Sequence, residues 1–572
     1  MFTIKFVRAI LATIIIYPTL SFSKNVLEAP LSYENTFTIA GMARKQLCRH
    51  LDSMELNSPR MNELLNNRDV RNLCYLSQFF SMLSKEKAAH IIELRDPKFK
   101  KWLLEQESFF KDYVDCGYVR KRSLTLFYAI WKQMEGKMDK NIMHLAMGAS
   151  LLSESINQEE IIAKFHFYHQ SLLNKRCYPQ ANELKPWEWA IVLQGGESID
   201  DLQWAQNFIE TKEIKPEQAG GVFCSFIPYR MHNRNGISIH SGGAFYDHKP
   251  ITLQLYTEYG GVCGAVSKGA AGFLRAKGVP AYPIGQPRHC AFIWKHPNGK
   301  WKIGNNIGGW NWANGGTKLP WEGPVQIITA LENFNSKPFS DESMLLYYFS
   351  LFSQKKDYAE MFLNIALKRN SYNYPAWLRY LQINAKNVGD QNKLDHLKKL
   401  SQGMPTEHNL IYHVATNILN INQSKINAYE LYACLVEDDT TRDQEELVTR
   451  LFWNKLIKEV PELAKTGTYQ SGITQGFLKL WLKKAKDIKW SAKMKTKTAQ
   501  AFQQIIPLLQ GKNQIFHHFC TSYASFIVLW NDKKQIQDAE KFIINLVKLS
   551  KNDQCVTVCN EMSDMINKII KK

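Results

Sequence analysis

The spacing of apolar residues divides the chain into three stretches. From about Glu28 to Lys212, apolar residues recur every three or four positions, which is the period of one face of an α-helix. Between Gly220 and Pro324 the chain changes to short apolar runs separated by glycine, which are typical of strands and turns. After Pro338 the helical period returns and continues toward the C-terminus. The pattern predicts an α+β protein in which two all-α helical domains flank a mixed middle segment.

These changes of pattern set the expected domain boundaries. Residues 24–212 form the predicted N-terminal helical domain, 213–337 the middle segment and 338–572 a C-terminal helical array. In the array, Ala359 and Pro375 are spaced as in tetratricopeptide (TPR) repeats, although no fixed period holds over three units. We therefore expect either a TPR-like surface that binds a protein partner or a domain that serves packing alone.

The first 23 residues have the pattern of a secretory signal peptide. Lys5 and Arg8 precede a short apolar run, and the small residues Ser21 and Ser23 follow it. The run is short for a membrane span, which needs about 20 residues. We therefore expect residues 1–23 to be cleaved from a secreted or periplasmic protein. The alternative is an uncleaved N-terminal membrane anchor.

Charge and cysteine content narrow the classes of partner and cofactor. The formal net charge is +19, but the lysines are spread along the chain and form no nucleic-acid-binding motif, so no specific nucleic-acid partner is expected. A basic secreted chain can adhere to an acidic envelope polymer. The 11 cysteines leave at least one thiol unpaired, and the lack of any CxxC pair argues against a zinc site.

A cysteine opens the helix predicted in the middle segment. The stretch 260–264 reads GGVCG, and apolar residues at helical spacing follow to about Lys277, where Gly278 ends the helix. The free N–H groups at a helix N-terminus stabilise a thiolate, so Cys263 occupies the position of a nucleophile. The other interpretations are a buried core thiol and half of a disulfide with Cys290.

The predicted strands carry the partners that a thiol nucleophile needs. His289 begins the run HCAFIWKH, a PNG turn follows, and the run WKIGNN returns with Asn305 and Asn306. The segments PAYPIG and GISIHSGGAFYD are also predicted to form strands. A thiol needs a base, and the base needs a group that orients it. We expect His289 to be the base and one of the two asparagines to be its partner.

The length of the hairpin turn decides between the two asparagines. A two-residue turn places Asn306 on the face of the hairpin that His289 shares, whereas a five-residue turn places Asn305 opposite His289. Because a slip of one residue moves every side chain to the other face, only one asparagine can serve. The sequence leaves both as candidates.

These residues together resemble the transglutaminase-like superfamily, the papain-related thiol enzymes. The resemblance is carried by GGVCGAVSKGAAGFLRAKGVPAYPIG, HCAFIW and GKWKIGN, and it covers roughly a hundred residues. It implies a transglutaminase-like (papain-like) α/β core with Cys263 as nucleophile, His289 as base and Asn305, four residues after Trp301, as the third member. The family usually has aspartate at that position. An asparagine can orient the imidazole but cannot neutralise its charge.

The resemblance implies a cysteine-dependent acyl transferase or hydrolase that acts on a peptide or a glutamine carboxamide. Cys263 would form a thioester, released by water in a peptidase or deamidase and by an amine in a cross-linking enzyme. This chemistry needs no metal and no cofactor. The N–H of Cys263 and the side chain of Gln254 or Tyr259 are expected to stabilise the oxyanion. The alternative is an inactive transglutaminase-like scaffold whose helical domains bind protein partners.

Overall fold

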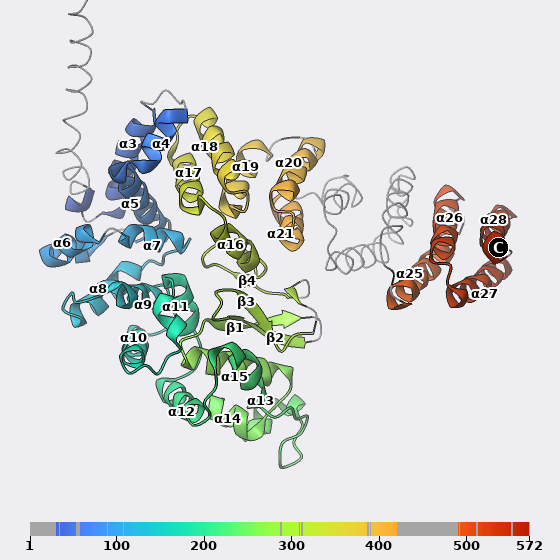
Figure 1. Ribbon diagram of the computed structural model, residues 1–572, viewed down its shortest axis with the longest axis horizontal. Coiled ribbons are helices and arrows are strands. Elements are labelled where there is room, and N and C mark those ends of the chain that lie inside the picture. Colours follow the sequence, from blue (N-terminus) through green and yellow to red (C-terminus); the bar gives the residue numbers. More distant parts are fainter. Residues whose placement is uncertain are drawn as a thin grey trace, which may run out of the picture. The chain divides into compact units, whose positions relative to one another are not determined.

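The computed structural model describes residues 30–33, 35–52, 58–88, 90–106, 108–286, 289–307, 309–310, 313–385, 388, 390–419, 490, 492–510, 513–550 and 553–570. The predicted signal peptide and residues 420–489 of the predicted helical array lie outside this part of the chain. The described part is mostly helical with a small antiparallel sheet, as expected for an α+β protein (Figure 1). The chain divides into two compact units, Met1–Ile383 and Asn384–Lys572. The domain boundaries predicted after residues 212 and 337 both fall inside the first unit.

Helices build the N-terminal part of the first unit, and local capping sets where several of them begin. The side chains of Asn67, Asp96 and Asn157 each accept a hydrogen bond from a backbone N–H in the first turn of the helix that follows. The elements are η1 (Pro30–Ser32), α3 (Thr36–Asp52), α4 (Ser58–Asn66), α5 (Arg68–Lys85), η2 (Ile92–Arg95), α6 (Pro97–Glu105), α7 (Phe109–Asp115), α8 (Ser123–Gln133), α9 (Lys140–Ser150), α10 (Gln158–Leu173), η3 (Pro179–Glu183), α11 (Pro186–Leu193) and α12 (Ile199–Glu210).

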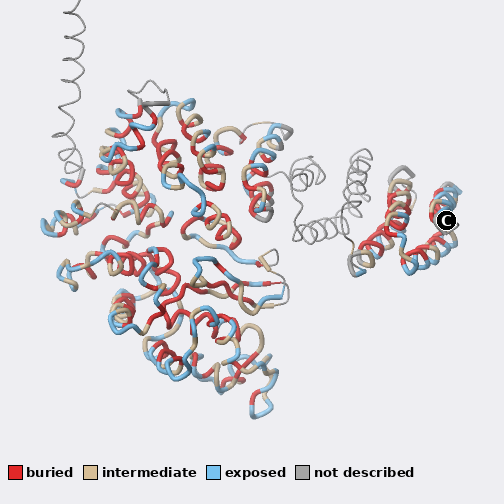
Figure 2. Tube along the Cα trace, in the orientation of Figure 1, coloured by how far each residue is buried: buried red, intermediate tan, exposed pale blue. Residues whose placement is uncertain are grey.

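The middle segment holds the sheet and the helix that packs against it. β1, β2 and β3 form an antiparallel sheet in that order, and α15 contacts both β1 and β2 (Figure 1). Figure 2 shows that buried residues dominate this packing. The elements are η4 (Pro216–Gln218), α13 (Ala219–Ser225), η5 (Ile239–Tyr246), α14 (Leu253–Tyr259), α15 (Cys263–Ala276), β1 (Ala281–Gln286), β2 (His289–Lys295), β3 (Trp301–Gly304), β4 (Gly316–Thr317) and β5 (Gly323–Pro324).

The helices after the sheet return to the N-terminal helices. In this part, α17 contacts α3 and α5, and the Tyr348 hydroxyl donates to the carbonyl of Val114 at 3.4 Å. The Cys48 thiol donates to the carbonyl of Phe352 at 3.0 Å. These contacts explain why one compact unit extends past the sheet. The helices are α16 (Ile327–Ser336), α17 (Ser340–Phe352), α18 (Lys356–Arg369) and α19 (Tyr374–Asn384).

The second unit is helical throughout its described residues. Its last four α-helices share a core built around Phe502, Phe519 and Tyr523. The elements are α20 (Asp390–Gly403), α21 (His408–His413), η7 (Val414–Ile418), α25 (Ala492–Ile505), η9 (Ile506–Leu509), α26 (Asn513–Trp530), α27 (Lys533–Leu549) and α28 (Asp553–Ile570). Within the described residues, no helix combines the length and the apolar character that crossing a bilayer requires.

Two local predictions were wrong. The segment GISIHSGGAFYD contains the 3-10 segment η5 in place of strands, because Ser238 caps it through the N–H of His240 and Gly242 (φ 62°) bends it. The hairpin between β2 and β3 has a three-residue loop, Pro297–Gly299, in place of two or five residues. Gly299 adopts φ 81°, and a left-handed glycine in the third position is typical of such loops.

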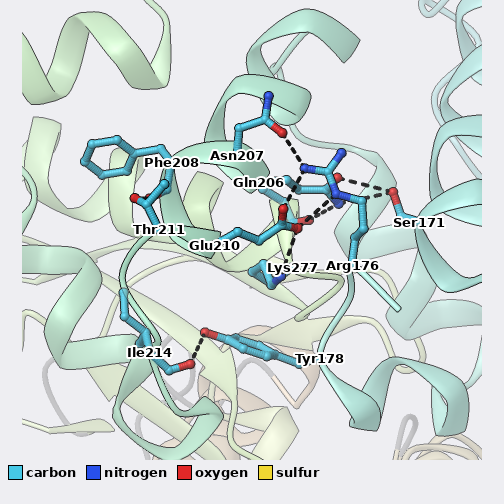
Figure 3. Close-up of polar contacts among 11 residues, drawn as sticks. Ser171, Arg176, Tyr178, Gln206, Asn207, Phe208, Glu210, Thr211, Ile214 and Lys277 are labelled. Carbon is cyan, nitrogen blue, oxygen red and sulfur yellow. Dashed lines mark hydrogen bonds and ion pairs between the residues drawn. The ribbon is translucent and has the colours of Figure 1, made fainter. Parts of the chain in front are cut away.

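The C-terminal end of α15 is held by side chains of the N-terminal helices. The Tyr168 hydroxyl donates to the carbonyl of Arg275 at 3.0 Å, and the Gln206 amide donates to the carbonyl of Ala276 at 2.8 Å. These bonds satisfy carbonyls that a helix end leaves without partners. Figure 3 shows the next layer, in which Glu210 pairs with Arg176 at 2.9 Å and lies 3.9 Å from Lys277. One end of α15 is thus fixed while the other presents Cys263.

Candidate active site

Backbone geometry places Cys263 at the first position of α15. Gly260 (φ 73°) and Gly261 (φ 152°) turn the chain into the helix, and Val262 is its N-cap. A Cβ on Gly260 would lie 2.1 Å from the carbonyl oxygen of Pro228, so only glycine fits there. Cys263 is half-buried and is a free thiol. The predicted start of the helix is confirmed, as is its stop at Gly278 (φ 72°).

The first turn of α15 contains backbone amides with and without a partner inside the helix. The N–H groups of Ala265 and Val266 donate to the carbonyl of Val262 at 2.9 and 3.1 Å. The N–H groups of Cys263 and Gly264 precede them and have no intrahelical acceptor by the geometry of a helix start. A Cβ on Gly264 would meet nothing within 4 Å. This arrangement suits the stabilisation of negative charge on an attacked carbonyl.

His289 is held in one tautomer by a backbone carbonyl. Its Nε2 lies 2.6 Å from the carbonyl oxygen of Asn305. Because a carbonyl oxygen can only accept, Nε2 carries the proton, and the lone pair of the neutral ring lies on Nδ1. The imidazole is therefore oriented as a base that can accept a proton at Nδ1. The described residues show no hydrogen bond between this ring and the Cys263 thiol.

Asn305 acts through both its backbone and its side chain. The residue follows β3 with φ 49°, a left-handed conformation that asparagine tolerates better than most residues. While its carbonyl faces His289, its side-chain amide donates to the Ser267 hydroxyl at 2.9 Å and to the carbonyl of Cys290 at 3.1 Å. The same nitrogen lies 3.4 Å from the carbonyl oxygen of Cys263.

This shared nitrogen brings the helix start and the strand start together. The carbonyl oxygens of Cys263 and Cys290 lie 3.4 and 3.1 Å from the same nitrogen, Asn305 Nδ2. The two oxygens are therefore close to each other. Ser267, buried one turn into α15, adds a second link by donating to the carbonyl of Cys290 at 2.6 Å. His289 precedes Cys290 directly, so the two predicted catalytic side chains stem from neighbouring backbone.

Asn306 lies in a separate set of contacts. Its Oδ1 accepts hydrogen bonds from the Gln286 amide at 2.8 Å and from the N–H of Gly309 at 2.7 Å. Gln286, which is buried and pairs with His289 across β1 and β2, also accepts from the N–H of Ile307 at 3.1 Å. These bonds brace the loop that follows Asn305. They reach His289 through Gln286 rather than by a contact with its ring.

The hairpin register explains why neither prediction for the asparagines describes the contact. In the observed register Phe292 pairs with Gly304, and the pairing ends there. A Cβ on Gly304 would lie 2.1 Å from the Phe292 ring, so the strand passes under this ring just before Asn305 turns out of the sheet. The expected side-chain contact with His289 is therefore replaced by a backbone contact from Asn305.

Two further thiols belong to residues that interact with Asn305, namely Cys290 and Cys224. Burial raises the pKa of Cys290, and the nearby charge of a Cys263 thiolate raises it further, whereas Ser267 and Lys268 lower it. Burial also raises the pKa of Cys224 to about 11, against the lowering effect of the Asn305 backbone N–H. Both neighbours are therefore protonated near neutral pH. Cys290 is a free thiol, so the disulfide with Cys263 is not formed in this structure.

The predicted side-chain donors for the oxyanion have partners elsewhere. The Gln254 amide donates to Glu258 at 2.9 Å, and the Tyr259 hydroxyl donates to Asp247. The N–H of Gly264 takes their place as the candidate second donor. Its signal in the sequence is the glycine directly after the cysteine, whereas nothing in the sequence singles out Ser267 or Gln286.

A metal centre finds no support in the described part of the chain, where no three His, Cys, Asp or Glu side chains gather as ligands would. Comparison of the chain with protein-family models, curated proteins and solved structures gives no match.

The polarity of the contacts favours asparagine over aspartate at position 305. The Asn305 side chain donates to two carbonyl oxygens and a hydroxyl, and a carboxylate has no hydrogen to donate. We therefore expect Asn305→Asp to lower the free energy of unfolding by about 1–3 kcal/mol. Urea unfolding of the full chain measures the change.

Asn306→Asp is the matched control for this substitution. Asn306 Oδ1 accepts two hydrogen bonds, and a carboxylate oxygen at the same place can accept both. An Asn305→Asp variant as stable as the wild type would show that the hydrogen bonds donated by the Asn305 amide do not stabilise the fold.

Proposed function

We propose that the protein is a cysteine-dependent acyl transferase or hydrolase of transglutaminase-like type, acting on a peptide or glutamine carboxamide outside the cytoplasm. The observation that carries the proposal is the bond from His289 Nε2 to the Asn305 carbonyl. This bond leaves Nδ1 as the basic nitrogen of the imidazole. His289 is the first residue of β2, and its backbone lies beside the start of α15. The extracytoplasmic location rests on the pattern of residues 1–23 alone.

The proposed reaction has two stages with balanced proton transfers. His289 Nδ1 takes the proton of the Cys263 thiol as the sulfur bonds to the carbonyl carbon, and the N–H groups of Cys263 and Gly264 bind the oxyanion. The carbon–nitrogen bond then breaks, and the imidazolium returns its proton to the departing amine or ammonia. Water or a second amine, deprotonated by His289, attacks the thioester and releases Cys263 as a thiol.

The thiol and the ring need to approach each other only during the reaction. Catalytic hydrogen bonds are often long or misaligned without substrate and tighten in the complex. The bond from Asn305 fixes the ring by one nitrogen only, which leaves the other available to the sulfur.

A second candidate function is an inactive scaffold with a transglutaminase-like core. The missing hydrogen bond between the Cys263 thiol and the His289 ring, in the part of the chain that the structure describes, favours it. In a scaffold, the hydrogen bonds donated by the Asn305 side-chain amide would serve only to hold α15 against the sheet. The two candidates differ in the reactivity that they assign to Cys263.

Alkylation by iodoacetamide at neutral pH separates them. We expect the reagent to label Cys263 first, because burial raises the pKa of Cys290 and of Cys224 and keeps their thiols protonated. Cys263→Ala should abolish this fast labelling. Peptide mass mapping measures which cysteines are labelled. Cys290→Ala and Cys224→Ala are the matched controls and should retain it. Equal labelling of the wild type and Cys263→Ala would support the scaffold.

A further inference from the structure

A short hairpin is anchored beside the start of α15. Its residues, 228–239, are called the 228–239 hairpin below. The carbonyl of Pro228 accepts from the N–H of Gly261 at 3.0 Å, and the N–H of Arg230 donates to the carbonyl of Gly261 at 3.0 Å. Tyr229 forms a parallel bridge with Gly261, two residues before Cys263. The backbone of the hairpin is therefore fixed next to the proposed nucleophile.

The hairpin is also rigid within itself. The N–H of Asn233 donates to the carbonyl of Ile237, and the N–H of Ile239 donates to the carbonyl of Met231. The buried Asn233 side chain donates to the carbonyl of Phe245 and accepts from the backbone inside the turn. A fixed backbone positions its side chains without further ordering, which lowers the cost of binding a ligand.

Large apolar side chains of this rigid hairpin stand in solvent. Tyr229 is 67% exposed and Met231 is 45% exposed, although the hydrogen bonds above hold their backbone. Exposed tyrosine and methionine are common anchors of binding surfaces. On the His289 side of the site, Ile307 is 59% exposed and is held by the bond of its N–H to Gln286. Exposed apolar groups thus adjoin both halves of the proposed catalytic pair.

The charges around these apolar groups are mainly positive. Arg234 is exposed on the hairpin, and the half-buried Arg230 donates from its guanidinium to the carbonyl of Glu258 at 3.3 Å. The exposed Lys268 interacts electrostatically with Cys290. Of the nearby acids, Asp247 accepts from Tyr259 and lies 3.9 Å from Lys249. Glu258 accepts from the Gln254 amide. Because Gln254 is neutral, Glu258 keeps its charge. The positive groups Arg230, Arg234, Lys249 and Lys268 still outnumber the acids Asp247 and Glu258 beside the exposed apolar side chains.

We infer that the 228–239 hairpin and Ile307 form the surface that binds the acyl donor. The donor is a protein or peptide with a large apolar side chain next to the reacting amide and acidic residues adjacent to it. Tyr229, Met231 and Ile307 contact the apolar side chain, and Arg230 and Arg234 face the acidic residues. The inference rests on the proposed function, because it names the substrate of the same site.

Peptide probes that alkylate the thiol test the inference without knowledge of the natural acceptor. Three peptides carry the same chloroacetamide group in place of the reacting carboxamide. One has leucine beside that group and two glutamates, one has serine in place of leucine, and one has lysines in place of the glutamates. The rate of Cys263 alkylation in the full chain is followed by intact mass and peptide mapping. Iodoacetamide reports the intrinsic reactivity of Cys263.

The leucine–glutamate peptide should alkylate Cys263 about tenfold faster than either other peptide. The burial of one large apolar side chain can supply this difference over the serine peptide, and attraction of glutamate and repulsion of lysine by the arginines can supply it over the lysine peptide. Tyr229→Ala should remove the preference for leucine. Arg230→Gln combined with Arg234→Gln should remove both the preference for glutamate and its loss in raised salt. The matched controls are Tyr33→Ala, at another exposed tyrosine, and Arg44→Gln combined with Lys45→Gln.

The possible failures are distinguishable. Equal rates for the three peptides, with normal iodoacetamide labelling of Cys263, would overturn the recognition surface and leave the proposed function standing. A Tyr229→Ala variant that slows iodoacetamide as much as the peptides would also overturn it, because the loss would then be structural. A Cys263 that does not react with iodoacetamide at all would overturn the proposed function, and the inference with it.

Discussion

Replacing His289 with glutamine is expected to slow acylation of Cys263 by about 10²–10⁴-fold, the usual contribution of a positioned general base. Glutamine is of similar size and can still donate to the Asn305 carbonyl, but it cannot take the thiol proton. Single-turnover release of amine from a peptide amide measures the effect. An amide is the appropriate substrate because its poor leaving group also needs the proton that His289 returns.

His296→Gln provides the matched control for this substitution. His296 follows the other end of β2, and its backbone N–H pairs with the carbonyl of Lys300 in the hairpin loop. This variant should therefore react at the wild-type rate. A His289→Gln variant that also kept the wild-type rate would remove His289 from the mechanism.

Replacing Glu197 with glutamine is expected to destabilise the first unit by about 3–5 kcal/mol, because it leaves the Arg275 guanidinium buried and without its counter-charge. The two side chains are only 12% and 7% exposed. Arg275 also donates to the carbonyl of Ala281, where β1 begins. The ion pair therefore joins the C-terminal end of α15 to the start of the sheet, and its loss should loosen the helix that carries Cys263.

The protection of α15 amides from hydrogen exchange at increasing denaturant measures this effect in the full chain. Glu135→Gln is the control, since Glu135 and its partner Lys137 are 74% and 80% exposed and surface pairs contribute little. Unchanged protection of α15 in Glu197→Gln would show that the ion pair does not hold the helix.

The effect of Glu197→Gln should depend on pH. Burial alone would raise the pKa of Glu197, but the charge and hydrogen bonds of Arg275 outweigh burial and lower it. A carboxyl whose pKa is lowered on folding stabilises the protein above its unfolded pKa of about 4.3. This stabilisation is lost as the pH falls through the folded pKa, so wild type and variant should converge in acid.

Local rules predicted the elements of the site better than its contacts. The pair Gly260–Gly261 and the stop at Gly278 set the bounds of α15, since each needs a backbone conformation that glycine adopts easily. The strand that begins at His289 followed from its apolar run. These features depend on residues close together in the sequence, and for that reason they could be predicted.

The contacts that hold His289 depend on features that the sequence does not display. The PNG turn closes as a three-residue loop, which shifts the register away from both alternatives. Asn305 then turns to φ 49°, so its carbonyl rather than its side chain faces the ring. A sequence motif shows which side chains are present. Because every residue has a backbone carbonyl, no motif could indicate that the carbonyl of Asn305 contacts His289. The link from Ser267 to Cys290 spans 23 residues and has no local pattern.

Cys263 and His289 are proposed to react as a pair, which can be examined with a bifunctional alkylating reagent. 1,3-Dibromoacetone alkylates a reactive thiol first and then bridges to a nucleophile within the reach of its short carbon chain. We expect peptide mapping to find Cys263 joined to His289, and His289→Gln to lose the bridge while keeping the first alkylation. A bridge from Cys263 to Cys290 or Cys224 in place of His289, or no reaction at Cys263, would show that Cys263 and His289 do not form a catalytic pair.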